Sequence, residues 1–307
     1  YADKNKTDEE FVTDLYKALL GRGLSAEELA GWVGQLQAGV SREDVLQGIA
    51  GSQEYADLCG KAGIYMIKEG WSVSNGNTYY RANGELVSGF RTIAGSQYYF
   101  DPANGNAMAV GWCYANDGYK YYFGGDGVML TDLDGVIGQQ SSYQIMVNKT
   151  CNVVTVYARD GGNGYIIPVK AFVCSTGEAT PVGTFNTPEK MRWQTLMEPC
   201  WGQWCTRIYQ GNLFHSVYYT SENDNNSLSV YAYNELGTTC SHGCVRLKAG
   251  DAKWIYDNCP TGTSVTIYES SYPGRYGKPT SYKLPSWHTW DPTDPNMYYK
   301  CQQNGCH

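Results

Sequence analysis

A repeat of about twenty residues runs from residue 70 to about residue 130. Its three units each open on a glycine and an aromatic residue, at Gly70-Trp71, Gly89-Phe90 and Gly111-Trp112. Two or three aromatic residues follow, and an Asn-Gly or Asp-Gly pair closes each unit. Such pairs are typical of tight hairpin turns. The repeat therefore predicts one β-hairpin per unit, stacked into a short β-solenoid.

The aromatic rings of this repeat have two interpretations. The chain holds 27 tyrosines and 36 glycines among 307 residues, which favours β structure with tight turns. The repeat resembles the aromatic repeats of choline- and glucan-binding surface proteins. That resemblance implies a module whose exposed rings stack on a cell-wall polysaccharide or a teichoic-acid-type polymer. In the alternative, the rings only fill the narrow core between hairpins.

The segment from residue 7 to about residue 60 has the pattern of three or four short helices. Thr7 with Glu10 and Ser25 with Glu28 have the spacing of capping boxes. The segment is similar to a small helical module that recurs in bacterial surface proteins and has no settled function. It contains no catalytic cluster, so we expect a spacer or an interaction role.

From Tyr143 onward the pattern becomes that of a mostly β, mixed α/β domain, in which short apolar stretches are typical of strands. The stretch 166–174 contains a proline, which places it at a sheet edge or a bulge. The expected elements are strands near 143–147, 154–156, 166–174, 229–233 and 264–268, and a short helix over 251–258 that is N-capped near Asp251. The chain is thus predicted to have a small all-α module (1–66), aromatic β-hairpin repeats (67–138), a catalytic domain (139–270) and a tail packed on that domain (271–307).

The stretch from Ser241 to Leu247 reads Ser-His-Gly-Cys-Val-Arg-Leu and concentrates chemistry in a few residues. A thiol becomes a nucleophile as the thiolate, so it needs a nearby base or positive charge. Gly243 lets a substrate approach the backbone closely, and its N–H and that of Cys244 are candidate donors to an oxyanion. A generic cysteine is more often structural, but this combination favours a catalytic Cys244.

Three stretches resemble the catalytic domain of the L,D-transpeptidase family of cell-wall enzymes, over roughly residues 142–270. The first is the Ser-His-Gly-Cys motif followed by an apolar residue, Arg246 and another apolar residue. The second is Thr180–Phe185 after Ser175-Thr176-Gly177, and the third is Phe214-His215-Ser216. The resemblance implies a mixed, mostly β fold of the L,D-transpeptidase type.

The resemblance also implies a role for each matched residue. Cys244 is the nucleophile, His215 is its general base, and the backbone carbonyl of Ser216 holds the His215 tautomer. His242 has a supporting role, although an extended segment would also bring it near the thiol as an alternative base. Arg246 is expected to bind a substrate carboxylate or lower the thiol pKa, with a structural salt bridge as its alternative. Ser241 and Gly243 complete the predicted site.

The implied reaction is acyl transfer between peptidoglycan stem peptides through a cysteine thioester, which forms cross-links between dibasic residues. Water in place of the acceptor amine would make the enzyme an L,D-carboxypeptidase. A protein that binds the cell wall without catalysis is the alternative from another class. The polar segment 221–227 lengthens the spacing between His215 and Cys244, and we expect it to form a hairpin tip or a lid over the cleft.

Eleven cysteines are many for a cytosolic protein and fit an exported one with disulfides. Cys200/Cys205 and Cys301/Cys306 have spacings that permit local bridges. A metal site is the less favoured interpretation, because no Cys-x-x-Cys pair occurs. We expect no metal and no organic cofactor. His288 and His307 have no motif around them and are expected at the surface.

Charged residues make up 17% of the chain and the formal net charge is −7, which argues against a nucleic-acid partner or an anionic membrane surface. No apolar run is long enough to span a membrane. The chain begins at Tyr1 without a visible signal peptide, so we expect a mature or trimmed form of an exported bacterial protein. Its expected location is extracellular, at the cell wall.

Overall fold

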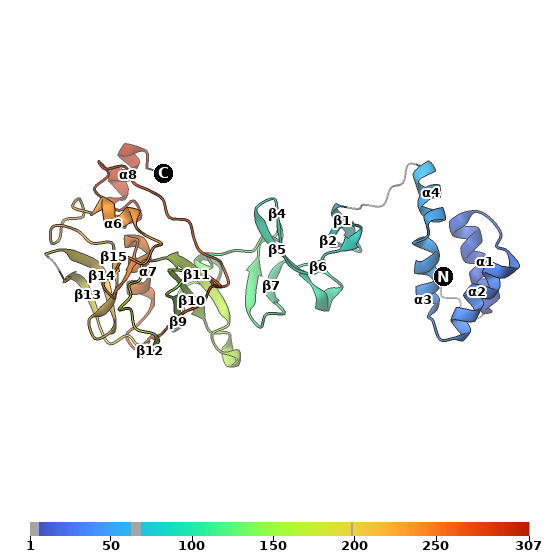
Figure 1. Cartoon of the computed structure of the whole chain (residues 1–307), viewed down its shortest axis with the longest axis horizontal. Coiled ribbons are helices and arrows are strands. Elements are labelled where there is room, and N and C mark those ends of the chain that lie inside the picture. The colour runs from blue at the N-terminus through green and yellow to red at the C-terminus, as the bar shows by residue number, and fades with distance from the viewer. Residues whose placement is uncertain (1–5, 63–68, 198, 307) are drawn as a thin grey trace. The chain divides into compact units, whose positions relative to one another are not determined.

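The computed structural model describes residues 6–62, 69–197 and 199–306 (Figure 1). The chain forms two compact units, Tyr1–Val87 and Ser88–His307. The expected boundary after residue 66 lies outside the described residues, and the division into four parts stays a prediction.

The N-terminal unit begins with short helices, as the capping pattern predicts. The Thr7 and Ser25 side chains each accept a hydrogen bond from a backbone N–H, and Glu10 and Glu28 return one, so both capping boxes are present. Gly21 follows in the left-handed conformation that favours glycine at a helix end. The helices are α1 (Asp8–Leu15), the π-helical turn η1 (Tyr16–Leu20), α2 (Ala26–Gln37), α3 (Arg42–Ala50) and α4 (Gln53–Lys61).

The repeat forms separate hairpins, and a β-solenoid is not supported. Within the described residues, the strands of each unit pair with one another and not with those of the next unit. The first hairpin belongs to the N-terminal unit and the other two to the C-terminal unit. The strands are β1 (Gly70–Ser74), β2 (Asn77–Ala82) and β3 (Glu85–Leu86), then β4 (Gly89–Ile93), β5 (Ser96–Asp101) and β6 (Ala107–Met108), then β7 (Gly111–Tyr114) and β8 (Lys120–Phe123), with η2 (Pro102–Asn104) after β5.

The repeat aromatics divide into two sets. In the second and third units Tyr99, Tyr121 and Phe123 are buried and pack ring against ring, so they fill a core. Trp71 and Trp112, by contrast, are each 40% exposed. The core-filling interpretation therefore applies to the buried rings, and a binding role for the exposed rings stays a prediction.

The third hairpin is joined to the fold that follows it. The Lys120 backbone N–H donates to the carbonyl of Ile166 at 2.9 Å, and the Lys120 ammonium pairs with Asp160 at 2.8 Å. Arg275, from the tail, pairs with Asp117 at 2.9 Å. These contacts fasten β7 and β8 to the edge of the first sheet described next.

Two sheets form the catalytic region, and their shared core contains Ile145, Val156, Phe214 and Val265. One sheet has the order β11-β10-β9-β17-β12 and the other β13-β14-β15-β16, with β15 and β16 parallel. Strand β11 is an edge strand, and the register shifts opposite Pro168, as expected for a proline in a strand. The strands are β9 (Tyr143–Asn148), β10 (Val153–Ala158), β11 (Ile167–Val173), β12 (Gly183–Asn186), β13 (Lys190–Thr195), β14 (Trp201–Tyr209), β15 (Asn212–Ser216), β16 (Val245–Leu247) and β17 (Ser264–Tyr268).

Two local predictions are wrong. The expected strand at 229–233 is the helix α6 (Val230–Asn234), because the Ser229 side chain accepts from the Ala232 N–H and caps a helical turn. The helix α7 (Ala249–Asn258) begins before Asp251, which therefore lies in its first turn and does not cap it. The short helices α5 (Asp134–Ile137) and η3 (Gly161–Asn163) complete this region, and every helix among the described residues is too short or too polar to cross a bilayer.

The tail after residue 270 contacts the region 142–267 through two of its carboxylates. Its Asp291 carboxylate accepts from the Ala249 N–H at 2.7 Å and so caps α7 from outside that helix. Asp294 accepts from Gln203 at 2.7 Å and from Asn225 at 2.9 Å. The tail ends in η4 (Pro295–Met297) and α8 (Tyr298–Asn304).

Candidate active site

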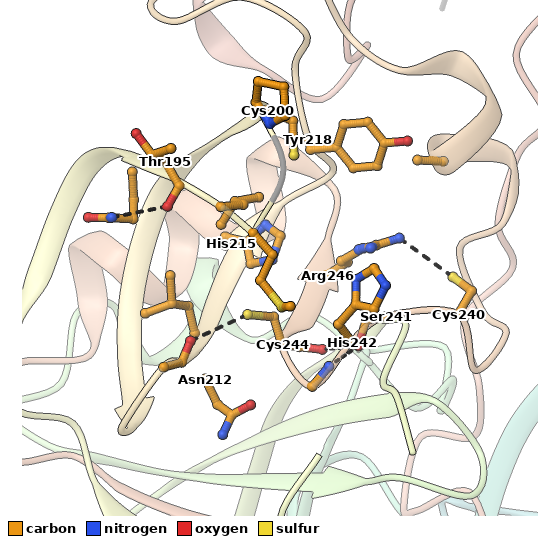
Figure 2. Close-up of a pocket in the computed structure, with 18 of the residues that line it drawn as sticks. Thr195, Cys200, Asn212, His215, Tyr218, Cys240, Ser241, His242, Cys244 and Arg246 are labelled. Carbon is orange, nitrogen blue, oxygen red and sulfur yellow. Dashed lines mark hydrogen bonds between the residues drawn. The ribbon is translucent and has the colours of Figure 1, made fainter. Parts of the chain in front are cut away.

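The predicted catalytic residues meet at one pocket of about 850 Å³, shown in Figure 2. The turn between β13 and β14, strand β15 and helix α6 surround it. Ser216 lies behind His215 in the same strand and is fully buried. The predicted residues that line the pocket are His215, Ser241, His242, Gly243, Cys244 and Arg246.

The Ser241 side chain holds the shape of the nucleophile loop. Its hydroxyl donates to the carbonyl of Cys244 at 2.6 Å and accepts from the Gly243 N–H at 3.1 Å. The Gly243 N–H is therefore engaged inside the loop and does not match its expected role as an oxyanion donor. Of the two donors expected from sequence, the Cys244 N–H is the remaining candidate. Ser241, expected to bind substrate, has a structural role in this geometry.

Gly243 is required by the loop. Its φ is +149°, outside the range that side chains favour, and a Cβ there would lie 2.6 Å from the Asn212 side-chain oxygen. The loop consequently passes close to strand β15 just before Cys244.

The Ser175–Thr180 segment clamps the nucleophile strand from its other side. Ser175 and Arg246 exchange two backbone hydrogen bonds of 2.9 Å. The carbonyl of Thr176 accepts from the Ser241 N–H, and the Thr180 hydroxyl donates to the carbonyl of Gly243 at 2.9 Å. The second family-like motif therefore positions the first by hydrogen bonds and contributes no reacting group.

Gly177 is a glycine because the backbone of Ser241 lies directly against it. A Cβ on Gly177 would lie 2.0 Å from the carbonyl oxygen of Ser241, which no side chain permits. Asn152 supports the same segment, because its side-chain oxygen accepts from the Thr176 N–H and hydroxyl at 2.8 Å each. No sequence motif pointed to Asn152, since its contact joins residues far apart in the chain.

His215 is buried and oriented as the resemblance implied. Its Nδ1 lies 2.6 Å from the carbonyl of Ser216, so Nδ1 carries the proton and Nε2 is the basic nitrogen. Gly202 on β14 provides the space for this ring, because a Cβ there would lie 2.9 Å from Nδ1. Sequence reasoning missed Gly202, which belongs to no recognised motif.

Burial keeps the nucleophile and the base uncharged. Burial, with the nearby charge of Arg246, lowers the pKa of His215 to about 4. Burial likewise raises the pKa of the Cys244 thiol, against the opposing effects of the Leu213 N–H and the charges of Arg246 and Arg207. The charge of Arg246 thus acts to lower the thiol pKa, as expected, but burial outweighs it. At neutral pH the two groups are a thiol and a neutral imidazole that line the same pocket, and the thiol donates to the carbonyl of Gly211 at 3.7 Å.

Arg246 is the register partner of His215 in the parallel pair of strands β15 and β16. Its guanidinium lies over the Tyr218 ring and 3.9 Å from the Cys240 sulfur. No ion pair involves Arg246 within the described residues, so the structural salt bridge is not supported. His242 lies exposed at the pocket rim.

The segment 221–227 forms a hairpin tip, one of the two expected alternatives, because Tyr219 pairs with Leu228 and the Thr220 N–H donates to the carbonyl of Ser227 at 2.8 Å. The polar segment 221–227 is absent from the described lining, and its Asn225 and Asn226 bind Asp294 and Lys300 of the tail instead. The turn between β13 and β14 and the exposed Tyr231 of α6 lie at the pocket.

Two expectations about the remaining cysteines and histidines change. Cys205, Cys301 and Cys306 are free thiols, so neither local bridge is formed. His288 is 3% exposed and not a surface residue, because the tail folds around it. His307 lies outside the described residues.

A Gly202→Ala substitution tests whether the His215 position controls the thiol. The added methyl group displaces the imidazole, so we expect alkylation of Cys244 to slow by roughly tenfold or more, as for a lost general base. Peptide mass mapping after a short pulse of iodoacetamide measures the rate at this cysteine. Gly135→Ala, with nothing within 4 Å of its Cβ, is the control. Equal rates in the two variants would contradict the assignment.

The lowered pKa of His215 predicts a pH dependence of stability. In the unfolded chain His215 becomes protonated below about pH 6.5, whereas in the folded protein it becomes protonated only near pH 4. This contribution is complete above pH 6.5 and is lost as the pH falls to 4, on the order of 3 kcal/mol. Urea unfolding at a series of pH values gives the free energy of unfolding of the protein and of His215→Gln. Plotted against pH, the two free energies should differ in slope between pH 6.5 and pH 4. Parallel curves would show that the imidazole is not desolvated.

Comparisons with known proteins agree with this geometry. Residues 142–267 match the family model of the L,D-transpeptidase catalytic domain, and residues 1–59 match a domain of unknown function, DUF4214. The Putative L,D-transpeptidase YciB of Bacillus subtilis is 37% identical over 119 residues, which are 36% of this chain and 59% of that protein. The chain therefore spans well under two thirds of that relative.

Solved structures also match, with low overall superposition. A fused Zn-dependent amidase/peptidase/peptidoglycan-binding protein of Clostridium acetobutylicum is 26% identical, with 42% of this chain and 53% of that chain covered and a TM-score of 0.32. An L,D-transpeptidase of Mycobacterium smegmatis is 16% identical, with 67% and 80% covered and a TM-score of 0.33. By the family model and by the Bacillus relative, residues 142–267 thus match the catalytic domain of the L,D-transpeptidase family.

Proposed function

We propose that this chain is a cysteine-dependent L,D-transpeptidase that acts on peptidoglycan stem peptides. The observation that carries the proposal is the meeting of Cys244, His215 and Arg246 at one pocket of a domain that matches this family. A pocket of about 850 Å³ is large enough for a peptide segment.

Acylation begins from the neutral pair. The basic Nε2 of His215 takes the proton of the Cys244 thiol as the sulfur attacks the carbonyl carbon of the dibasic residue in a donor tetrapeptide. The carbonyl of Ser216 stabilises the imidazolium that forms, since it accepts from the Nδ1–H. The Cys244 N–H is the proposed donor to the tetrahedral oxyanion.

Collapse of that intermediate breaks the peptide bond. The imidazolium returns its proton to the departing nitrogen of D-alanine, and a thioester on Cys244 remains. The amine of a second stem peptide then attacks the thioester, gives its proton to His215 and restores the thiol. Water in the same position would release a free carboxylate, which is the carboxypeptidase reaction.

Arg246 is the proposed site for a donor carboxylate. Its guanidinium lines the pocket, and no carboxylate of the described residues is paired with it. Guanidinium and carboxylate form charge-assisted bonds that orient a substrate as well as attract it. This role needs neither a metal nor an organic cofactor.

Purified muropeptides test the reaction. We expect the full chain to convert tetrapeptide donors into cross-linked dimers through an intact-mass adduct on Cys244. The adduct and turnover should be absent in Cys244→Ala, because no thioester forms. His215→Ala should acylate the same thiol roughly a hundredfold more slowly. Substantial turnover by Cys244→Ala would refute the proposal.

Oxygen-18 water separates the two acceptors in the same assay. Cross-linked products contain no label from solvent, whereas tripeptide released by hydrolysis takes up one oxygen from water. A product mixture that is almost wholly labelled would assign the chain as a carboxypeptidase. A folded protein that binds cell walls but acylates no donor would favour the binding-only alternative.

We further propose that the hairpin repeats hold the enzyme at the cell wall, outside the cell. Trp71 and Trp112 support this, since each packs edge-on against a tyrosine and is 40% exposed. Such rings suit the apolar faces of a wall polysaccharide, and a teichoic-acid-type polymer is the alternative ligand.

Replacement of both tryptophans tests this anchoring. Trp71→Ala with Trp112→Ala should lower binding to purified sacculi several-fold and leave turnover of soluble muropeptides unchanged. The control is Tyr282→Ala, because Tyr282 is also exposed but lies in the tail. Sacculi stripped of teichoic acids distinguish the two polymers. Undiminished binding by the double variant would contradict an anchoring role for these rings.

A further inference from the structure

The C-terminal tail gathers one histidine and two cysteines that the proposed reaction does not use. His288, Cys301 and Cys306 place their ligand atoms within 4.8 Å of one another. His288 and Cys301 are buried and Cys306 is partly buried. The two cysteines flank the end of α8, where the Cys306 N–H donates back to the carbonyl of Cys301 and turns the chain toward His288.

His288 is oriented as a metal ligand requires. Its Nδ1 lies 2.9 Å from the carbonyl of Trp290, so this nitrogen carries the proton. Nε2 then keeps its lone pair and lies 3.0 Å from the Cys306 sulfur. Ligating histidines commonly donate their other ring N–H to a carbonyl in this way, which fixes the tautomer. The Trp290 ring stacks on the imidazole at 3.8 Å and limits its rotation.

Cys301 has surroundings that suit a thiolate. The indole N–H of Trp290 donates to its sulfur at 3.1 Å, in an environment with 0% exposure. An uncompensated thiolate is costly at such a site, but a metal cation supplies the missing charge. A disulfide between Cys301 and Cys306 would leave the lone pair of His288 without a role.

We propose that His288, Cys301 and Cys306 bind a divalent transition metal ion, zinc by preference. Two thiolates and one imidazole form a soft ligand set that selects zinc over calcium or magnesium. Binding releases one proton from each thiol to solvent, and the ion takes the two sulfurs and Nε2. A fourth position is left for water or a further donor. This site does not depend on the transpeptidase proposal.

The metal would clamp the tail against the catalytic domain. Between His288 and Cys301, Asp291 caps α7 and Asp294 binds Gln203. The backbone N–H of Gln203 in turn donates to the Ser216 hydroxyl oxygen at 3.0 Å, next to the proposed base His215. A metal ion bound by His288, Cys301 and Cys306 would fix both ends of the tail segment 288–301. It would thereby stabilise strand β15, which carries His215.

Metal analysis of the full chain tests the site. We expect protein purified without chelators to hold about one zinc per chain, and cobalt substitution to give the absorption of thiolate-bound, four-coordinate Co²⁺. His288→Gln should lose zinc, lower the midpoint of thermal unfolding, and keep both thiols. Cys59→Ser removes a thiol from α4 and should change neither zinc content nor cobalt spectrum.

Three results would overturn the proposal. One is a native mass lower by two hydrogen atoms, with a Cys301–Cys306 disulfide in the peptide map. Another is full zinc retention by His288→Gln. The third is a wild-type chain that gives no thiolate band with cobalt under reducing conditions. If His288→Gln fails to fold, the cobalt titration of the unaltered chain decides the question.

Discussion

The backbone ladder between the Ser175–Thr180 segment and the nucleophile strand is the interaction on which the site depends. Strand β16 is only three residues long and gains rigidity by pairing with β15 on one side and with this segment on the other. Gly177 and Gly243 allow the approach, since a side chain at either would collide with backbone or with Asn212. Cys244 and His215 consequently line one pocket before any substrate arrives, which in the proposed reaction lowers the entropy cost of attack.

Burial decides how this pair reacts. A desolvated thiol with a raised pKa and a desolvated imidazole with a lowered one do not form an ion pair at rest. In the proposed reaction, proton transfer from Cys244 to His215 therefore accompanies the attack of the sulfur on the substrate carbonyl. A neutral resting thiol is also less prone to oxidation than a thiolate, which suits an enzyme expected outside the cell.

The tail contacts helix α7, strand β14 and the segment 221–227, which are far from it in the sequence. Its carboxylates cap α7 and bind Gln203, and it holds the 221–227 segment away from the pocket. The His288, Cys301 and Cys306 cluster closes this arrangement at its ends. The tail is thus part of the support of the active site, and the segment expected as a lid is part of its anchorage.

The sequence by itself determined the helical caps and the contact of His215 with the Ser216 carbonyl, and it is the source of Cys244 and His215 as the proposed nucleophile and base, because each depends on a motif of a few residues. It also predicted hairpins from Asn-Gly and Asp-Gly pairs. Tertiary structure decided the rest. Alternation at 229–233 predicted a strand, yet Ser229 caps a helix there, and the hairpins do not stack into a solenoid. The Gly243 N–H is engaged within its own loop by a conformation of Ser241 that the motif does not reveal. The space beside Gly202 and the buried His288 result from tertiary packing, which no local pattern records.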